Sequence, residues 1–251
     1  MKFTVLTLFP DIVKAFFENS IMAKAVEKEI IAYDLVNIRD FATDKHHTCD
    51  DGTYGGGAGQ LLMPEPLSKA LDSVNARKKY VIFVTPSGKQ LTQKVAEELS
   101  HKDELVFICG RYEGIDQRII DSYVDLELSI GDYVMSSGEV VIDTVYRLVD
   151  GVIKHESLEE ESYCDGLLEY PQYTHPEEWK GMKVPSVLLS GNHEEIRKWR
   201  LKKRLMKTMA NRPDLIASAR ARGQLTEEAE KMIEEITETV FLKKQKKKRR
   251  K

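Results

Sequence analysis

Short, nearly continuous apolar stretches alternate with helical patterns over the first 150 residues of the chain. The stretch Val81-Ile82-Phe83-Val84 has no polar position, which is typical of a strand covered on both faces. Strands that alternate with helices predict an α/β fold with a parallel sheet, because each crossover places a helix on the sheet. Strands are expected at 3–8, 33–38, 80–85, 105–109 and 124–130, and helices at 12–29, 92–100, 116–123 and 140–149.

The alternation ends near residue 155, where a stretch rich in acidic residues, Ser, Tyr and Pro begins. This composition is typical of a linker or lid. Further on, Asn192 precedes Glu195 by three residues, which is typical of a helix start, and helix breaks are expected at Arg212-Pro213 and near Gly223. The pattern predicts an α/β domain over 1–154, a linker over 155–178, a small all-helical domain over 179–242 and a basic disordered tail over 243–251.

Basic residues gather in two segments, although the net charge is only −3. Eight lie between Arg197 and Arg212 without an acidic residue, and eight more lie in the C-terminal tail. The rest of the chain holds 22 basic residues against 41 acidic ones, so only these segments attract a polyanion. The tail is interpreted as a solubilising end. The first segment is interpreted as a nucleic-acid footprint, since Trp199, Leu201 and Leu205 place apolar contacts among its charges.

Composition and cysteine content favour a cytoplasmic protein. No apolar run approaches the length that crosses a bilayer, and the N-terminus lacks the features of a signal peptide. Cys49, Cys109 and Cys164 are too few and too far apart for a disulfide framework or a zinc ribbon. We therefore expect no membrane partner. His46 and His47 stand close to Cys49, but further ligands at useful spacing are lacking, so no metal ligand is predicted.

Three of the expected strands end in small residues that expose the backbone. In an open α/β sheet, ligands bind outside the carboxyl ends of the strands, so these three ends predict one pocket. No lysine is built into them, which favours an adenine or a nucleoside over a multiply charged phosphate. A glycine-rich segment, 50–59, lacks a Walker pattern and is interpreted as a flexible surface loop. The three strand ends are Thr85-Pro86-Ser87-Gly88, Cys109-Gly110-Arg111-Tyr112-Glu113-Gly114 and Gly131-Asp132-Tyr133-Val134-Met135-Ser136-Ser137-Gly138.

The motifs of the chain together resemble those of the bacterial tRNA (guanine-N1-)-methyltransferases, the TrmD family of the trefoil-knotted SPOUT class. They follow one another as in that family up to about Leu242, and as a set they are highly specific. The resemblance implies a parallel sheet with a deep trefoil knot at the C-terminal end of the α/β domain. The motifs are Thr7-Leu8-Phe9-Pro10, Asp50-Asp51 with Tyr54-Gly55-Gly56-Gly57, Cys109-Gly110-Arg111-Tyr112-Glu113-Gly114, Ile130-Gly131-Asp132-Tyr133-Val134, Gly166-Leu167-Leu168 with Tyr170-Pro171-Gln172-Tyr173-Thr174, and Val184-Pro185 through Leu189-Ser190-Gly191-Asn192-His193.

The resemblance implies S-adenosylmethionine as the cofactor, bound in a bent form, and it suggests a divalent ion, Mg²⁺. The implied substrate is tRNA, methylated at N1 of the guanosine just 3′ of the anticodon, at position 37. The family also implies a homodimer whose active site is shared between the subunits. The implied cofactor-binding residues are Pro86, Gly110, Tyr112, Glu113, Ile130, Gly131, Asp132, Tyr133, Val134, Met135 and Gly138.

The chemistry of guanine explains the catalytic residues that the resemblance implies. N1 carries a proton at neutral pH, so a carboxylate is needed as general base, and an arginine can stabilise negative charge on O6. The family's arginine matches Arg147, and the register set by Gly166-Leu167-Leu168 matches Glu161 to the family's aspartate. Taken alone, the acidic run 159–161 would be interpreted as a solvated linker. For tRNA binding, the basic segment predicts Arg197, Arg200, Lys202, Lys203, Arg204 and Lys207.

The chain departs from the family at three places. Ser137 stands where the family has glycine, about four residues are missing before Val140, and Glu161 replaces aspartate in a linker one residue shorter. Four residues are about one helical turn, so the helix face is nearly kept. These departures support an alternative, a non-catalytic tRNA-binding relative with an impaired cofactor pocket. Retention of Arg147 and of Tyr112-Glu113-Gly114 favours an active methyltransferase, and a generic nucleotide-binding protein is the third reading.

Overall fold

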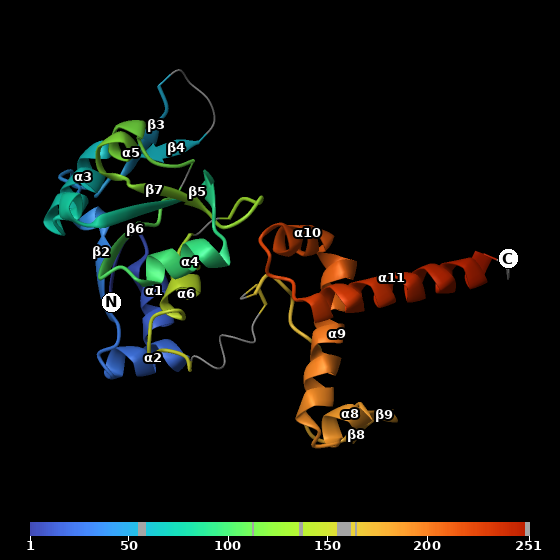
Figure 1. Cartoon of the computed structure of the whole chain (residues 1–251). Coiled ribbons are helices and arrows are strands. Elements are labelled where there is room, and N and C mark those ends of the chain that lie inside the picture. Colours follow the sequence, from blue (N-terminus) through green and yellow to red (C-terminus); the bar gives the residue numbers. More distant parts are fainter. Residues whose placement is uncertain (55–58, 112, 136–137, 155–161, 164, 249–251) are drawn as a thin grey trace. The chain divides into compact units, whose positions relative to one another are not determined.

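The computed structural model describes residues 1–248 except 55–58, 112, 136–137, 155–161 and 164, and it describes side chains up to residue 239. The chain divides into two compact units, Met1–His155 and Glu156–Lys251. A five-stranded sheet with helices forms the first unit, and helices dominate the second (Figure 1).

The sheet of the first unit is parallel throughout, which confirms the predicted α/β class with a parallel sheet. Its strands lie in the order β2-β1-β6-β5-β7. The predicted strands agree with the observed ones to within two residues, except for the end of the third. The strands are β1 (Lys2–Thr7), β2 (Ala32–Asn37), β5 (Tyr80–Gln90), β6 (Glu104–Ile108) and β7 (Leu126–Ser129).

Strand β5 is five residues longer than the sequence predicts, because its pairing with β7 is interrupted and then resumes. Val84 and Lys89 are both paired with Leu128, so residues 85–88 are skipped by the ladder. A Cβ added at Gly88 would lie 2.4 Å from the backbone nitrogen of Leu128, so only glycine permits this close approach. The skipped residues are the first of the three small-residue ends, and they have no register partner in β7.

Helices cover both faces of the sheet, and each face has its own apolar core (Figure 1). Strand residues alternate between the two cores, with Phe107 on one side and Val106 and Ile108 on the other. The first face packs against α1 (Pro10–Phe17), α2 (Ser20–Glu27), α4 (Gln93–Ser100) and α6 (Val141–Tyr146); the second packs against α3 (Pro64–Ser73) and α5 (Gln117–Tyr123).

The prediction of one continuous helix over 12–29 is wrong, because the chain forms α1 and α2 with a break at Asn19. Asn19 has extended backbone, with φ −126° and ψ 156°, and Ser20 has φ 56°. The side-chain amide of Asn19 donates to the carbonyl of Ala15 at 2.8 Å, so it satisfies a carbonyl near the end of α1. Asn and Ser form such local bonds readily, which explains why the apolar periodicity alone misleads here.

Other elements of the first unit agree with the sequence or add to it. Helices α4 and α5 begin where expected, and their caps Thr92 and Asp116 accept from the backbone N–H groups of Val95 and Arg118. Helix α6 ends three residues earlier than predicted. The elements not predicted are α3, an antiparallel hairpin of β3 (Asp50–Gly52) and β4 (Gln60–Leu62), and the 3₁₀ turns η1 (Ile38–Phe41) and η2 (Ala76–Lys78).

Helices dominate the described part of the second unit, and a short hairpin there corrects the expectation of an all-helical domain. The predicted breaks at Arg212-Pro213 and near Gly223 are confirmed, and Asn192 caps its helix by accepting from the N–H of Glu195 at 3.2 Å. The hairpin is β8 (Glu178–Trp179) with β9 (Met182–Lys183), and the helices are α8 (Ser186–Leu189), α9 (His193–Asn211), α10 (Pro213–Ala221) and α11 (Glu227–Lys248).

The last helix extends into the segment predicted to be a disordered tail, since α11 continues to Lys248. Lys and Gln are good helix formers, and no Gly or Pro interrupts them. None of the helices among the described residues is long and apolar enough to cross a membrane. The knot, the domain boundaries and the role of segment 155–178 stay predictions.

Candidate functional site

One cavity of about 560 Å³ lies at the carboxyl ends of β6 and β7 and beside the interruption of β5, the strand between them in the sheet. The three small-residue ends of the sequence therefore meet in one place, as predicted from the general rule for open α/β sheets. The cavity is lined by Phe9, Phe83, Val84, Thr85, Pro86, Gly110, Arg111, Glu113, Gly114, Ser129, Ile130, Tyr133, Val134, Met135 and Gly138.

Eight of the predicted cofactor-binding residues line this cavity: Pro86, Gly110, Glu113, Ile130, Tyr133, Val134, Met135 and Gly138. Gly131 and Asp132 do not line it, and Tyr112 lies outside the described residues. Sequence reasoning missed Phe9 and Arg111 as parts of the site. Both belong to motifs shared with the TrmD-like pattern, Thr7-Leu8-Phe9-Pro10 and Cys109-Gly110-Arg111-Tyr112-Glu113-Gly114, and these motifs were the available signal.

Gly131 shapes the cavity indirectly, through Tyr133. Its φ of +151° is disfavoured for any side chain, and an added Cβ would lie 2.4 Å from Cε1 of Tyr133. The Tyr133 hydroxyl donates to the carbonyl of Ile130 at 3.0 Å, and the hydroxyl of Ser129 donates to the carbonyl of Gly131 at 3.1 Å. The loop after β7 is thus held in a tight turn whose aromatic side chain forms a wall of the cavity.

The cavity has one cationic and one acidic side chain among its described lining residues, Arg111 and Glu113. Nη2 of Arg111 donates to Oε1 of Glu139 at 3.0 Å, and Glu139 is buried, with 1% of its side chain exposed. Beside this pair, burial raises the pKa of the Cys109 thiol well above its usual value, and the Glu139 carboxylate adds to the shift. Cys109 therefore stays protonated and is no nucleophile.

Of the two predicted catalytic residues, the structure describes only Arg147. Arg147 lies at the C-terminal end of α6 and is not among the residues that line the cavity. Glu161 lies outside the described residues. Their pairing over guanine stays a prediction from the resemblance.

The motif that sets the register of Glu161 packs against α9. Leu167 is buried in the core of the second unit, and the N–H of Leu168 donates to Oγ1 of Thr208 at 3.0 Å. Gly166 has φ +85°, which favours glycine, and an added Cβ would lie 3.2 Å from Oε1 of Gln224. The position of this motif is thus defined by packing within the second unit.

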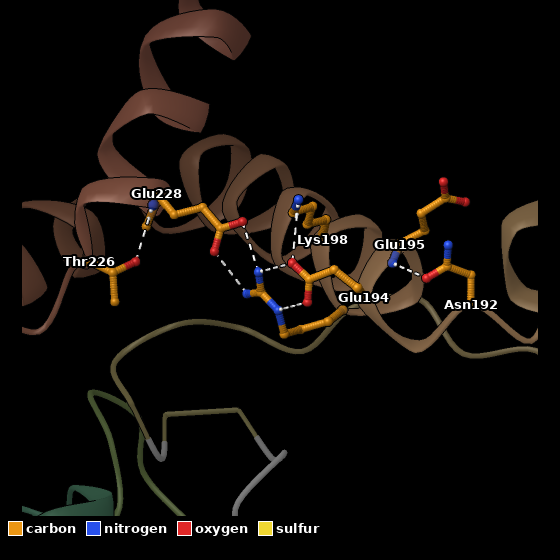
Figure 2. A network of polar contacts seen from close by, with 8 residues as sticks. Asn192, Glu194, Glu195, Lys198, Thr226 and Glu228 are labelled. Carbon is orange, nitrogen blue, oxygen red and sulfur yellow. Dashed lines mark hydrogen bonds and ion pairs between the residues drawn. The ribbon is translucent and has the colours of Figure 1, made fainter.

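Two of the cations predicted to bind tRNA, Arg197 and Arg204, form ion pairs with acids, including acids from distant parts of the sequence. Arg197 pairs with Glu194 at 2.9 Å and with Glu228 at 2.8 Å, so α9 and α11 are joined by one network (Figure 2). Hydrogen bonds from Arg197 and Lys198 lower the pKa of Glu194 to about 2. Arg204 donates to Asp165 at 2.7 Å and to the carbonyl of Leu168 at 3.2 Å.

The other predicted cations make different contacts. The ammonium of Lys203 lies 5.6 Å from the ring centre of Trp199, Lys207 is exposed, and Lys202 lies 3.8 Å from the exposed Glu235. The guanidinium of Arg200 stacks on Tyr170 at 4.6 Å. Within α9, we therefore expect Lys203 and Lys207 to contribute more to tRNA contacts than Arg197 and Arg204 do.

Replacing Lys203 and Lys207 together by alanine is expected to weaken tRNA binding. Each lost phosphate contact should lower the slope of log Kd against log salt by roughly 0.7 to 0.9. Filter binding at four salt concentrations measures the slope. Lys24→Ala in α2 with Lys28→Ala at its C-cap removes the same charge from the other unit and should leave the slope unchanged. An equal effect of both variants would show that tRNA binding depends on the net charge of the protein and not on these two lysines of α9.

Arg204→Ala is expected to act differently from these lysine changes. The change removes the ion pair of the largely buried Arg204 with the more exposed Asp165. It also removes the hydrogen bond that Arg204 donates to the carbonyl of Leu168. We expect a lower melting temperature as well as weaker tRNA binding.

No group of three or more His, Cys, Asp or Glu side chains could hold a metal ion in the part of the chain that the structure describes. Cys49 and Cys109 are buried free thiols. Cys164 lies outside the described residues.

Comparison with known proteins defines the class of this site. Residues 1–218 match the family described as tRNA (Guanine-1)-methyltransferase TrmD. The class is therefore that of the SPOUT methyltransferases, to which TrmD belongs, and the cavity at the strand ends lies where such an α/β protein binds its ligand.

Relatives that match this chain along nearly their whole length are named tRNA (guanine-N(1)-)-methyltransferase. The tRNA (guanine-N(1)-)-methyltransferase of Treponema denticola is 67% identical over 240 residues, which covers 94% of this chain and 99% of that protein. Those of Treponema pallidum and Borrelia duttonii are 58% and 62% identical, covering 94% and 86% of this chain and 96% and 92% of the relatives. The chain belongs to the TrmD family, and the reading as a non-catalytic relative has no support from these proteins.

Proposed function

We propose that the protein transfers a methyl group from S-adenosylmethionine to N1 of the guanosine at position 37 of tRNA. The observation that supports this proposal most is the identity of 58–67% to proteins named for guanine-N1 methylation, along almost their full length. The cavity at the ends of β6 and β7 and at the interruption of β5 supplies a place for the cofactor.

The residues that line the cavity fit this cofactor. Apolar side chains such as Phe83, Pro86 and Ile130 provide walls for an adenine ring, and glycines expose main-chain groups that can bond its edge. Arg111 and Glu113 provide opposite charges for a zwitterionic amino-acid group. When bound, the cofactor supplies an electrophilic methyl group on a sulfonium.

The chain's own residues then have two tasks in the reaction. Glu161 takes the proton from N1, so that the ring nitrogen becomes nucleophilic, and Arg147 stabilises the negative charge that develops on O6. Because Arg147 stands outside the cavity lining, a second subunit is the natural source of one half of the site. We accordingly propose a homodimer with a shared active site, located in the cytoplasm, with Mg²⁺ as an additional requirement.

Methylation of a tRNA transcript by the purified protein tests the proposal. We expect 1-methylguanosine among the nucleosides after digestion of a transcript with guanosine at position 37. A transcript with adenosine at that position should give none. Tight tRNA binding without any methylated nucleoside would favour a non-catalytic role instead.

A further inference from the structure

Arg111 and Glu139 form a buried ion pair behind the wall of the cavity. The guanidinium side chain is 14% exposed and the carboxylate 1%. Oε1 of Glu139 accepts from Arg111 at 3.0 Å and from the hydroxyl of Thr7 at 3.2 Å. The guanidinium carbon of Arg111 also lies 4.8 Å from the ring centre of Phe9. Through these contacts, Glu139, just before α6, is connected with Thr7 at the end of β1 and with Arg111, which follows β6.

Stability alone does not explain this pair. Burying two charges costs several kcal/mol in desolvation, and a well-packed neutral pair of similar volume is often equally stable. The pair is also incompletely satisfied, because Oε2 of Glu139 has no hydrogen-bond partner among the described residues. A role in orienting Arg111 gives a reason for a carboxylate at this position.

Arg111 is the single cation among the described residues that line the cavity. A guanidinium presents its donors in a planar fork that matches a carboxylate better than an ammonium does. Glu139 and the ring of Phe9 hold the group from two sides, so its orientation toward the cavity costs little entropy on binding. The chemistry of the wall therefore suits a ligand that carries a carboxylate.

We propose that Arg111, positioned by Glu139, receives the α-carboxylate of S-adenosylmethionine. This inference rests on the proposed function, because it takes that cofactor as the ligand. Arg111 is then a specificity-determining residue for the amino-acid end of the cofactor, and Glu139 is its positioning residue.

The test compares S-adenosylmethionine with its decarboxylated form, which lacks only the carboxylate, by titration calorimetry on the full chain without tRNA. The parent protein should prefer S-adenosylmethionine by at least about tenfold, as expected for a charge-assisted hydrogen bond. In the variant with a neutral pair, Arg111→Met with Glu139→Gln, the ratio of the affinities for the two ligands should fall to about one. The KM for S-adenosylmethionine should rise while the single-turnover rate at saturation changes little.

A matched control exists at the opposite end of the sheet. There Glu104 accepts from Thr4 at 3.1 Å and from Lys79 at 2.7 Å, which repeats the same chemistry away from the cavity. The variant Lys79→Met with Glu104→Gln should keep the parent's preference. If thermal denaturation shows that the neutral Arg111–Glu139 variant is not folded, Arg111→Lys replaces it in the test. This change keeps the ion pair but removes the planar guanidinium, so it should also lower the preference for S-adenosylmethionine.

The outcomes separate this inference from the proposed function. A parent that binds neither ligand would contradict the proposed function itself. A parent that binds both ligands equally, or a variant at position 111 that keeps the full preference, would overturn the carboxylate assignment and leave the proposed function intact.

Discussion

Glu161→Ala is expected to slow methyl transfer by about 100-fold or more, the usual effect of removing a general base. The proton on N1 of guanine must leave before the ring can attack the methyl group, and the family resemblance gives that task to Glu161. Binding of tRNA and of S-adenosylmethionine should stay within a few-fold of the parent, because the loss concerns the reaction step alone. Single-turnover methylation of a transcript with guanosine at position 37 measures the rate.

Glu161→Asp gives a second, sharper test of the same assignment. If the longer side chain compensates for a linker one residue shorter than in the family, the aspartate stops short of N1 and the rate falls. Glu160→Ala serves as the neighbouring control and should remain active. Full activity of Glu161→Ala would contradict the assignment of Glu161 as general base, and Glu159 and Glu160 would become the candidates.

The parallel sheet could be predicted because its strands are apolar on both faces. Residues such as Val106 and Phe107 are neighbours in sequence but are buried in different cores, and this double burial produces the continuous apolar runs. The break between α1 and α2 could not be predicted from periodicity, because it involves the backbone conformation of Asn19 and Ser20 and a local side-chain bond from Asn19. The same holds for β5, whose pairing resumes at Lys89 only because Gly88 allows close approach.

The location of the cavity could also be predicted, since three small-residue ends of neighbouring strands meet there. The charge pairs could not. Arg204 meets Asp165 and Arg197 meets Glu228 at separations of 39 and 31 residues, so a segment that looks purely cationic in sequence is partly neutralised in the fold. The pair of Arg111 with Glu139, 28 residues apart, is of the same kind. Such contacts depend on tertiary structure and leave no local pattern.

Gly131→Ala is expected to weaken S-adenosylmethionine binding, although Gly131 does not itself line the cavity. At φ +151° an alanine is strained, and its Cβ would lie 2.4 Å from the ring of Tyr133. The loop must leave this turn to relieve the strain, and binding must restore it. Strain of about 1–3 kcal/mol corresponds to a loss of about five- to 150-fold in affinity. Gly131→Trp should abolish binding altogether.

Calorimetric titration with S-adenosylmethionine measures this effect, and Gly181→Ala is its control. Gly181 also has a left-handed φ, +77°, but a Cβ there would meet nothing within 4 Å, and the residue lies in the turn between β8 and β9. That variant carries a similar backbone penalty and should bind the cofactor as the parent does. Unchanged affinity in both Gly131 variants would mean that the turn after β7 and the position of Tyr133 do not contribute to cofactor binding. Cofactor binding would then have to depend on the interruption of β5 and the end of β6 alone.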